Sequence, residues 1–280
     1  MTQKVRGSTA TAIRPTSYEE CDFRDCCYYR LFCSTANEVE RPNIECFKAN
    51  EHLTTNKKDE RFLYIMYSGL CVEVYTSEEG DERPLSILGA SQALNPGAAV
   101  RRFDVSANMH FLVDSEVCRL PISPVSRRLL SNPELGTYLI DALFSTVIGA
   151  SALIWVYSGT RCIDRIRHLL FLLAYLYKRY LVDEPSRRQL RNLFASGEGK
   201  EERCWVEIKV PHSLISSIAH ASRPQIKSAF EKLNKEGCVE HSYRNVRVDI
   251  NHVLGEDPHN LFPIENIDAL FPLCDLFSKP

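Results

Sequence analysis

The sequence predicts an α+β protein in which a β-rich part, a helical part and a small mixed part follow one another. Short apolar runs broken by Gly, Asn, Asp and Pro fill residues 61–121, and long helical patterns fill residues 132–180. Residues 204–250 begin as a strand, continue as two short helices and end as a hairpin. The 280 residues can bury a sizeable core, and because the formal net charge is -2, any binding of nucleic acid needs a local basic surface.

The β-rich part contains four short runs: RFLYIMYSG, LCVEVYTS, RPLSILG and MHFLVDSEVCRLP. Runs with this spacing are typical of a sandwich or barrel. Between the second and third runs, SEEGDE includes Gly80, which can adopt the positive φ of a hairpin loop. We therefore predict a β-hairpin at this point.

The helical part begins at NPE, where Asn132 can cap a helix and Pro133 fits its first turn. This helix is expected to run to Tyr157, and a break near SGT separates it from CIDRIRHLLFLLAYLYKRY, whose apolar residues recur at helical spacing. Residues 142–160 carry no charge and are nearly long enough to span a bilayer. A membrane span is thus one interpretation, and a helix that pairs with another helix is the other.

Residues 204–250 contain the most specific pattern in the chain. A short strand precedes a helix whose apolar face is Leu214, Ile215, Ile218 and Ala219. After the turn HAS, Ser222 can cap a second helix that has Pro224 in its first turn and ends at Gly237. CVEHSYRNVRVDI then predicts a hairpin that turns at YRN. The order strand, helix, turn, helix and β-wing is that of a winged helix-turn-helix.

The second of these helices has the chemistry of a DNA reader. A helix fits the major groove with its N-terminal side chains facing base edges, and Arg223, Gln225 and Lys227 are expected to be exposed at that end. Arginine pairs with guanine, glutamine with adenine, and lysine with guanine or a phosphate. We include Ser222 as the cap and His220 as a phosphate contact. The alternative is that these residues form an ordinary solvated helix face.

The motifs LISSIAHASRPQIKSAFEKLNKEGCVE, FLYIMYSGLCVEVYTSEEGDERPLSIL and CIDRIRHLLFLLAYLYKR resemble the CRP/FNR superfamily of bacterial transcription regulators, and the FNR branch in particular. The resemblance implies a cyclic-nucleotide-binding-like β-barrel (jelly roll), a long dimerisation helix and a C-terminal winged helix-turn-helix. The domains expected from it are a flexible N-terminal segment (1–20), a cysteine-rich lead and sensor barrel (21–130), dimerisation and connecting helices (131–182), the DNA-binding domain (183–250) and a C-terminal extension (251–280).

The resemblance also implies how such a regulator works. The partners would be a double-stranded DNA operator, RNA polymerase and a second copy of the chain, whose long helix would pack closely beside Asp141, Ser145, Gly149 and Ser151. Because the first residues lack the apolar run of a secretory signal, a cytoplasmic protein without a membrane span is expected. Cyclic AMP is not expected as a ligand, since the loop that contains Arg101 and Arg102 lacks the family's glutamate.

The stretch CDFRDCCYYRLFC places four thiols within thirteen residues. In the FNR branch, cysteines before the barrel and one in a late strand hold an iron–sulfur cluster, which implies a 4Fe-4S site from four of Cys21, Cys26, Cys27, Cys33 and Cys118. A thiol switch, a zinc site and ordinary buried cysteines are the alternatives. A regulator with a small-molecule ligand or no cofactor also remains open. No catalytic residues are assigned, and a cysteine-dependent enzyme is the alternative class of protein.

Overall fold

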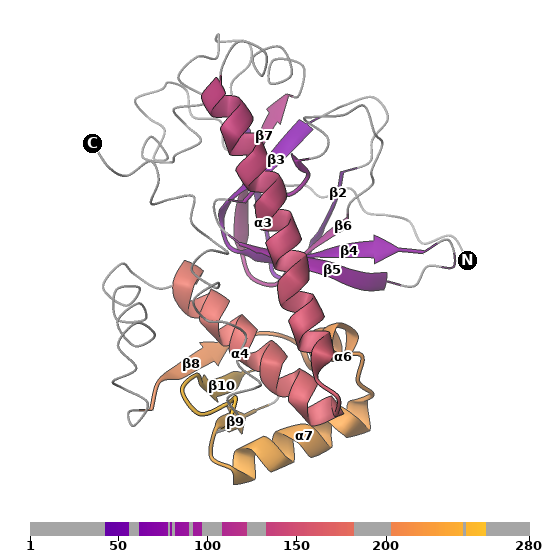
Figure 1. Cartoon of the computed structure of the whole chain (residues 1–280), viewed down its shortest axis with the longest axis vertical. Coiled ribbons are helices and arrows are strands. Elements are labelled where there is room, and N and C mark those ends of the chain that lie inside the picture. The colour runs from indigo at the N-terminus through magenta and orange to yellow at the C-terminus, as the bar shows by residue number, and fades with distance from the viewer. Residues whose placement is uncertain are drawn as a thin grey trace.

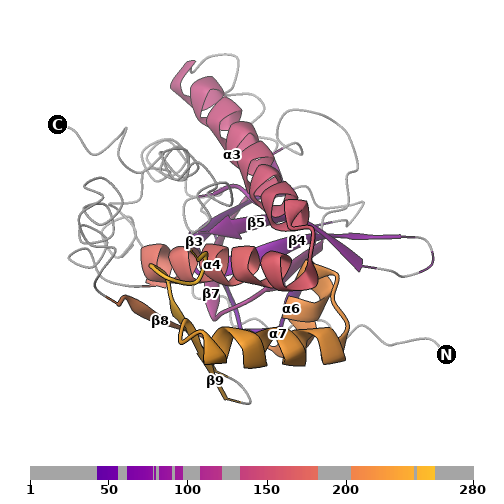
Figure 2. The same ribbon diagram turned by 60° about the horizontal axis from the view of Figure 1, so that its bottom comes forward.

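The computed structural model describes residues 43–55, 62–77, 79, 82–89, 92–96, 108–121, 133–181, 203–242 and 245–255. Within these residues the predicted α+β class is confirmed, because antiparallel sheets and helices occupy successive parts of the chain. The long helix α3 (Pro133–Ser158) extends along the β-rich part, and α4 (Cys162–Leu181) follows it (Figure 1). Helix α4 packs beside α7 (Arg223–Lys235) in the C-terminal part (Figure 2).

The described residues of the β-rich part form two antiparallel sheets, with strand orders β2-β6-β4-β5 and β1-β7-β3. The strands are β1 (Asn43–Phe47), β2 (His52–Thr54), β3 (Phe62–Ser68), β4 (Leu70–Thr76), β5 (Glu82–Gly89), β6 (Asn108–Phe111) and β7 (Ser115–Pro121). One core cluster takes side chains from both sheets, and within it the rings of Phe47 and Phe111 stack with 4.3 Å between centroids. The two sheets therefore enclose a packed apolar interior.

The predicted hairpin is confirmed, since β4 pairs with β5 from Leu70 opposite Gly89 to Thr76 opposite Glu82. The loop residue Gly80 lies outside the described residues. Glu73 and Ser86 face each other in this hairpin, and the Ser86 hydroxyl donates to Glu73 Oε2 at 2.7 Å. Burial raises the pKa of the Glu73 carboxyl, while the Ser86 hydrogen bond opposes that rise.

Two features of the β-rich part differ from the pattern in the sequence. The run MHFLVDSEVCRLP contains two strands, because the chain crosses from one sheet to the other after Phe111. The chain makes the opposite crossing at Gly69, which has a φ of 110° and would place a Cβ 2.1 Å from Ser115 Oγ. Strands β1 and β2 precede the region that was predicted to be β-rich. Both are short, so their alternation is too brief to stand out.

Helix α3 begins at Pro133 as predicted and is apolar on two faces. One face packs on β5 and buries Leu139, Ala142, Gly149, Ala152, Leu153 and Val156. The other face is exposed and carries Ile140, Leu143, Phe144, Val147 and Ile154, of which Phe144 is 61% exposed and Ile154 is 66% exposed. The spacing of the exposed residues, at steps of three, four and seven, is that of a helix-pairing stripe.

Gly149 corrects one expectation. The family resemblance places Gly149 on the face of α3 that meets a second subunit, but it is buried against β5 of the same chain. A Cβ at this position would lie 2.9 Å from the carbonyl oxygen of Ile87. The absence of a side chain at Gly149 therefore allows α3 to approach its own sheet. Ser151, by contrast, lies on the exposed face of α3, as expected.

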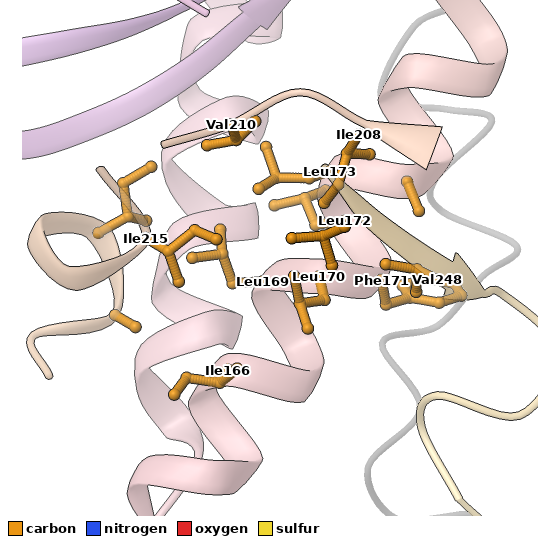
Figure 3. Packing of buried hydrophobic residues seen from close by; sticks show 14 of the residues in the cluster. Ile166, Leu169, Leu170, Phe171, Leu172, Leu173, Ile208, Val210, Ile215 and Val248 are labelled. Atoms are coloured by element: carbon orange, nitrogen blue, oxygen red, sulfur yellow. The ribbon is translucent and has the colours of Figure 1, made fainter. Parts of the chain in front are cut away.

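Helix α4 is the centre of a large core cluster. Its residues from Leu169 to Tyr177 are all buried, because strands, α3 and the two helices of the C-terminal part surround it. Figure 3 shows Ile166, Leu169, Leu170 and Leu173 of α4 together with Ile208, Val210 and Ile215 of the following segment. In the part of the chain that the structure describes, none of the helices combines the length and apolar character that a bilayer span requires.

The C-terminal part contains the predicted elements in the predicted order. These are β8 (Trp205–Ile208), α6 (His212–Ala219), α7, β9 (Val239–His241) and β10 (Val246–Asp249), and the sheet order is β8-β10-β9. All four residues expected on the apolar face of α6 are buried, as are Ile226, Phe230 and Leu233 of α7. Gly237 follows α7 with a φ of 72°, which confirms it as the residue that ends the helix.

Candidate nucleic-acid interface

The turn between α6 and α7 is short and closed by hydrogen bonds. His220 caps α6 in the left-handed conformation with a φ of 46°, and its backbone N–H donates to the Ser217 carbonyl. The Ala221 N–H donates to the Ser216 carbonyl at 3.1 Å, and the Ser216 hydroxyl donates back to the Ala221 carbonyl. This turn fixes the direction in which α7 leaves α6.

The N-terminus of α7 is capped as the sequence predicts, with Ser222 as the N-cap residue. The backbone N–H and the hydroxyl of Ser222 both donate to Gln225 Oε1, at 2.8 and 2.9 Å. This pairing of the N-cap residue with the third helical residue is the geometry of a capping box. Since a bidentate contact with adenine uses both the oxygen and the nitrogen of the amide, Gln225 would have to release Ser222 to make one.

After Pro224, the outer surface of α7 is polar. Because Ile226, Ala229, Phe230 and Leu233 are buried, helical geometry places the opposite line of residues at Pro224, Ser228, Glu231 and Lys235. Arg223 and Lys227 flank this line, and both are exposed as predicted. Lys227 Nζ lies 3.9 Å from Glu231 Oε1. Neither Ser228 nor Glu231 was assigned a role from the sequence, although the period of the buried residues identifies both.

A small wing follows α7. Strands β9 and β10 pair from Val239 opposite Val248 to His241 opposite Val246, and the Ser242 N–H donates to the Asn245 carbonyl at 2.9 Å. The chain therefore turns between Ser242 and Asn245, as YRN predicts, while the tip residues lie outside the described residues.

Three rings join the wing to both helices. The fully buried Phe230 of α7 stacks with His212 of α6 and with His241 of β9, at 5.1 Å between centroids in both pairs. Burial lowers the pKa of His212, and the neighbouring His241 lowers it further. The positions of α6, α7 and the wing are thus fixed relative to one another by one ring cluster.

The turn after α6 is also attached to the end of α3. Arg165, in the first turn of α4, donates from Nε to the Ala219 carbonyl at 3.0 Å and from Nη1 to the Gly159 carbonyl at 3.2 Å. Beside it, the ring of His220 lies 5.0 Å from that of Tyr157. His220 is exposed, as a phosphate contact requires, but its ring contacts α3.

The predicted cluster ligands are only partly described by the structure. Cys118 is a half-buried residue of β7, opposite Ile44 of β1 and Ile65 of β3. Cys46 of β1 points to the same side of this sheet, two residues away in register. Cys21, Cys26, Cys27 and Cys33 lie outside the described residues, as do Arg101 and Arg102. Among the residues that are described, no group of three or more His, Cys, Asp or Glu side chains is arranged to hold a metal ion.

The chain shares its fold with transcriptional regulators of the CRP/FNR family. A CRP/FNR-family regulator from Thermus thermophilus has 17% sequence identity and a TM-score of 0.54, with 75% of this chain and 95% of that chain covered. A CRP-family regulator from the same organism also has 17% identity and a TM-score of 0.54, over 73% and 91% of the two chains.

A third similar structure is that of a regulator described as responsive to a ligand. It is the c-di-GMP-responsive global regulator CLP of Xanthomonas campestris, with 11% identity, a TM-score of 0.54, and 74% of this chain and 93% of that chain covered. No protein-family model matches the sequence, and no curated protein matches it. At these identities the similarity establishes the fold.

Proposed function

We propose that the chain is a sequence-specific DNA-binding transcription regulator of the CRP/FNR type, and not an enzyme. One observation carries the proposal: α7 is capped, follows a short closed turn and presents a polar outer surface beside a β-wing. These are the features with which a winged helix-turn-helix enters the major groove. Arg223, Lys227, Lys232 and Lys235 give α7 a local basic surface that the net charge of -2 does not reveal.

Arg223 is the residue proposed to read a guanine. It is exposed in the first turn of α7, directly after the N-cap Ser222, where side chains face base edges in such complexes. Ser222 and Gln225 hold this turn in place, and His220 lies beside it. Replacing Arg223 should therefore weaken binding to the preferred site by about 1–3 kcal/mol and relax the preference at one base pair.

Binding titrations on a randomised operator library test this function. Arg223→Ala is compared with Arg83→Ala, which removes the same charge from an exposed position on β5. Arg83→Ala should retain the wild-type affinity and preference. A wild-type chain that binds every DNA sequence equally, or none, would show that the regulator proposal is wrong.

We further propose that the regulator acts as a homodimer on a double-stranded operator and with RNA polymerase. The exposed stripe of α3 supports the homodimer, because Ile140, Phe144, Val147 and Ile154 would leave water if two copies paired along it. Two copies of α7 would then read a site with matching two-fold symmetry. The expected location of such a regulator is the cytoplasm.

The signal is proposed to be oxygen or an oxidant, sensed through the cysteines. The density of thiols between Cys21 and Cys33 and the half-buried residue Cys118 support this, as an FNR-like 4Fe-4S cluster or as a thiol switch. Anaerobic purification followed by visible absorption and iron and sulfide analysis distinguishes these two forms. Cys118→Ser should abolish the response, whereas Cys71→Ser, which replaces a fully buried thiol in β4, should leave it intact.

A further inference from the structure

Glu231 is the one acidic residue in α7, within a helix that has four basic residues. It lies on the line opposite the buried face, one turn beyond Lys227, and the two side chains are 56% and 79% exposed. In homeodomains, the residues of the reading helix that contact bases lie at steps of three, four and seven. Pro224, Lys227, Ser228 and Glu231 have this spacing, so Glu231 occupies a reading position.

Helix stability does not explain the pair. A lysine four residues before a glutamate is the less favourable order, and an exposed pair of this kind contributes little. Glu231 also carries a cost for DNA binding, because its negative charge would lie between two rows of phosphates. A carboxylate at this position therefore weakens binding to DNA in general unless a base donates a hydrogen bond to it.

We infer that Glu231 reads a cytosine and that Lys227 supports it from the neighbouring position. A carboxylate accepts a hydrogen bond from the cytosine N4 amino group, which the major groove exposes. Lys227 Nζ, 3.9 Å from Glu231 Oε1, neutralises the carboxylate and can donate to a guanine beside that cytosine. Glu231 is thus a specificity-determining residue. This inference rests on the proposed function.

Binding titrations of Glu231 variants on the randomised library test the inference, with protein prepared both in air and without it. Glu231→Ala should lose preference at one base pair, by roughly tenfold against wild type. Glu231→Gln should change that preference from cytosine toward adenine, since an amide pairs with adenine. Lys227→Ala should weaken the cytosine preference at the same base pair. The control Glu207→Gln removes an exposed carboxylate from β8 and should leave every preference unchanged.

The possible outcomes distinguish the role of Glu231 from the function of the whole chain. If wild type prefers certain sequences and both Glu231 variants keep those preferences, the assignment of Glu231 is wrong while the regulator proposal stands. If wild type has no sequence preference in either preparation, the regulator proposal itself is wrong. A new preference for adenine in Glu231→Gln supports both.

Discussion

The ring of Tyr157, in the last turn of α3, lies against the ring of His220, in the turn between α6 and α7, with 5.0 Å between the ring centroids. These two residues are far apart in the sequence, and they join the end of the long helix to the turn that directs α7. Arg165 strengthens the junction through the carbonyls of Gly159 and Ala219. The end of α3 is therefore in direct contact with the turn that precedes the proposed reading helix.

Tyr157 gives the first prediction. Its hydroxyl oxygen is buried and has no hydrogen-bond partner among the described residues, and burial raises its pKa. Tyr157→Phe removes an unsatisfied polar atom, so the free energy of unfolding should stay the same or rise by up to about 1 kcal/mol. Tyr157→Ala removes the ring and should lower it by about 2 kcal/mol. Urea denaturation measures the free energy of unfolding of both variants. A large decrease of this free energy in Tyr157→Phe would contradict the conclusion that the hydroxyl is buried without a partner among the described residues.

The two glycines of α3 give the second prediction. Gly149→Ala would place a methyl group 2.9 Å from the Ile87 carbonyl oxygen, and the backbone would have to move, at a cost of about 1–3 kcal/mol. Gly136→Ala is the matched control, since a Cβ there meets nothing within 4 Å among the residues that the structure describes. That variant should be more stable than wild type by up to about 1 kcal/mol, because alanine favours helix. If the midpoint temperature of thermal unfolding shifts equally in both variants, α3 does not approach β5 as closely as described.

The exposed stripe of α3 gives the third prediction. Val147 is 60% exposed at the middle of the stripe, so Val147→Glu would place two unpaired charges in a symmetric interface. In sedimentation experiments, the dissociation constant of the dimer should rise by roughly 100-fold or more. Val147→Leu keeps the apolar surface and should remain dimeric. If Val147→Glu dimerises as wild type does, the proposed interface lies elsewhere.

His110 gives the fourth prediction, which concerns pH. Burial, and then the neighbouring His52 ring 4.2 Å away, lower the pKa of His110 from 6.5 to about 4. The unfolded chain therefore binds more protons than the folded chain between these two values, and stability should fall as the pH falls from 6.5 to about 4. The pKa of His212 is also lowered, so this residue likewise makes the stability fall as the pH falls.

Unfolding free energies measured across this pH range test the His110 prediction. The unfolding free energy of His110→Gln should depend less steeply on pH than that of wild type. His52→Gln should keep most of the slope, because burial is the larger cause of the shift. Parallel curves for wild type and His110→Gln would exclude His110 as the source.

Most of the candidate interface could be predicted from the sequence because its signals are local. Ser222 caps α7 and Gly237 follows its end, and these effects act between residues close together in the chain. The period of Ile226, Phe230 and Leu233 likewise determines which side chains of α7 are exposed. The sequence therefore predicted the order of elements in this part and the exposure of Arg223 and Lys227.

The tertiary structure decided what depends on distant partners. Both faces of α3 are apolar, so its pattern did not reveal that Gly149 packs on β5 while Val147 remains exposed. The strand pattern did not reveal where the chain crosses between sheets, because a crossing depends on pairing with strands elsewhere in the chain. The contact of Tyr157 with His220 also joins separate elements. Periodicity reports that a side chain is buried or exposed, whereas the identity of its partner is set only when the elements pack.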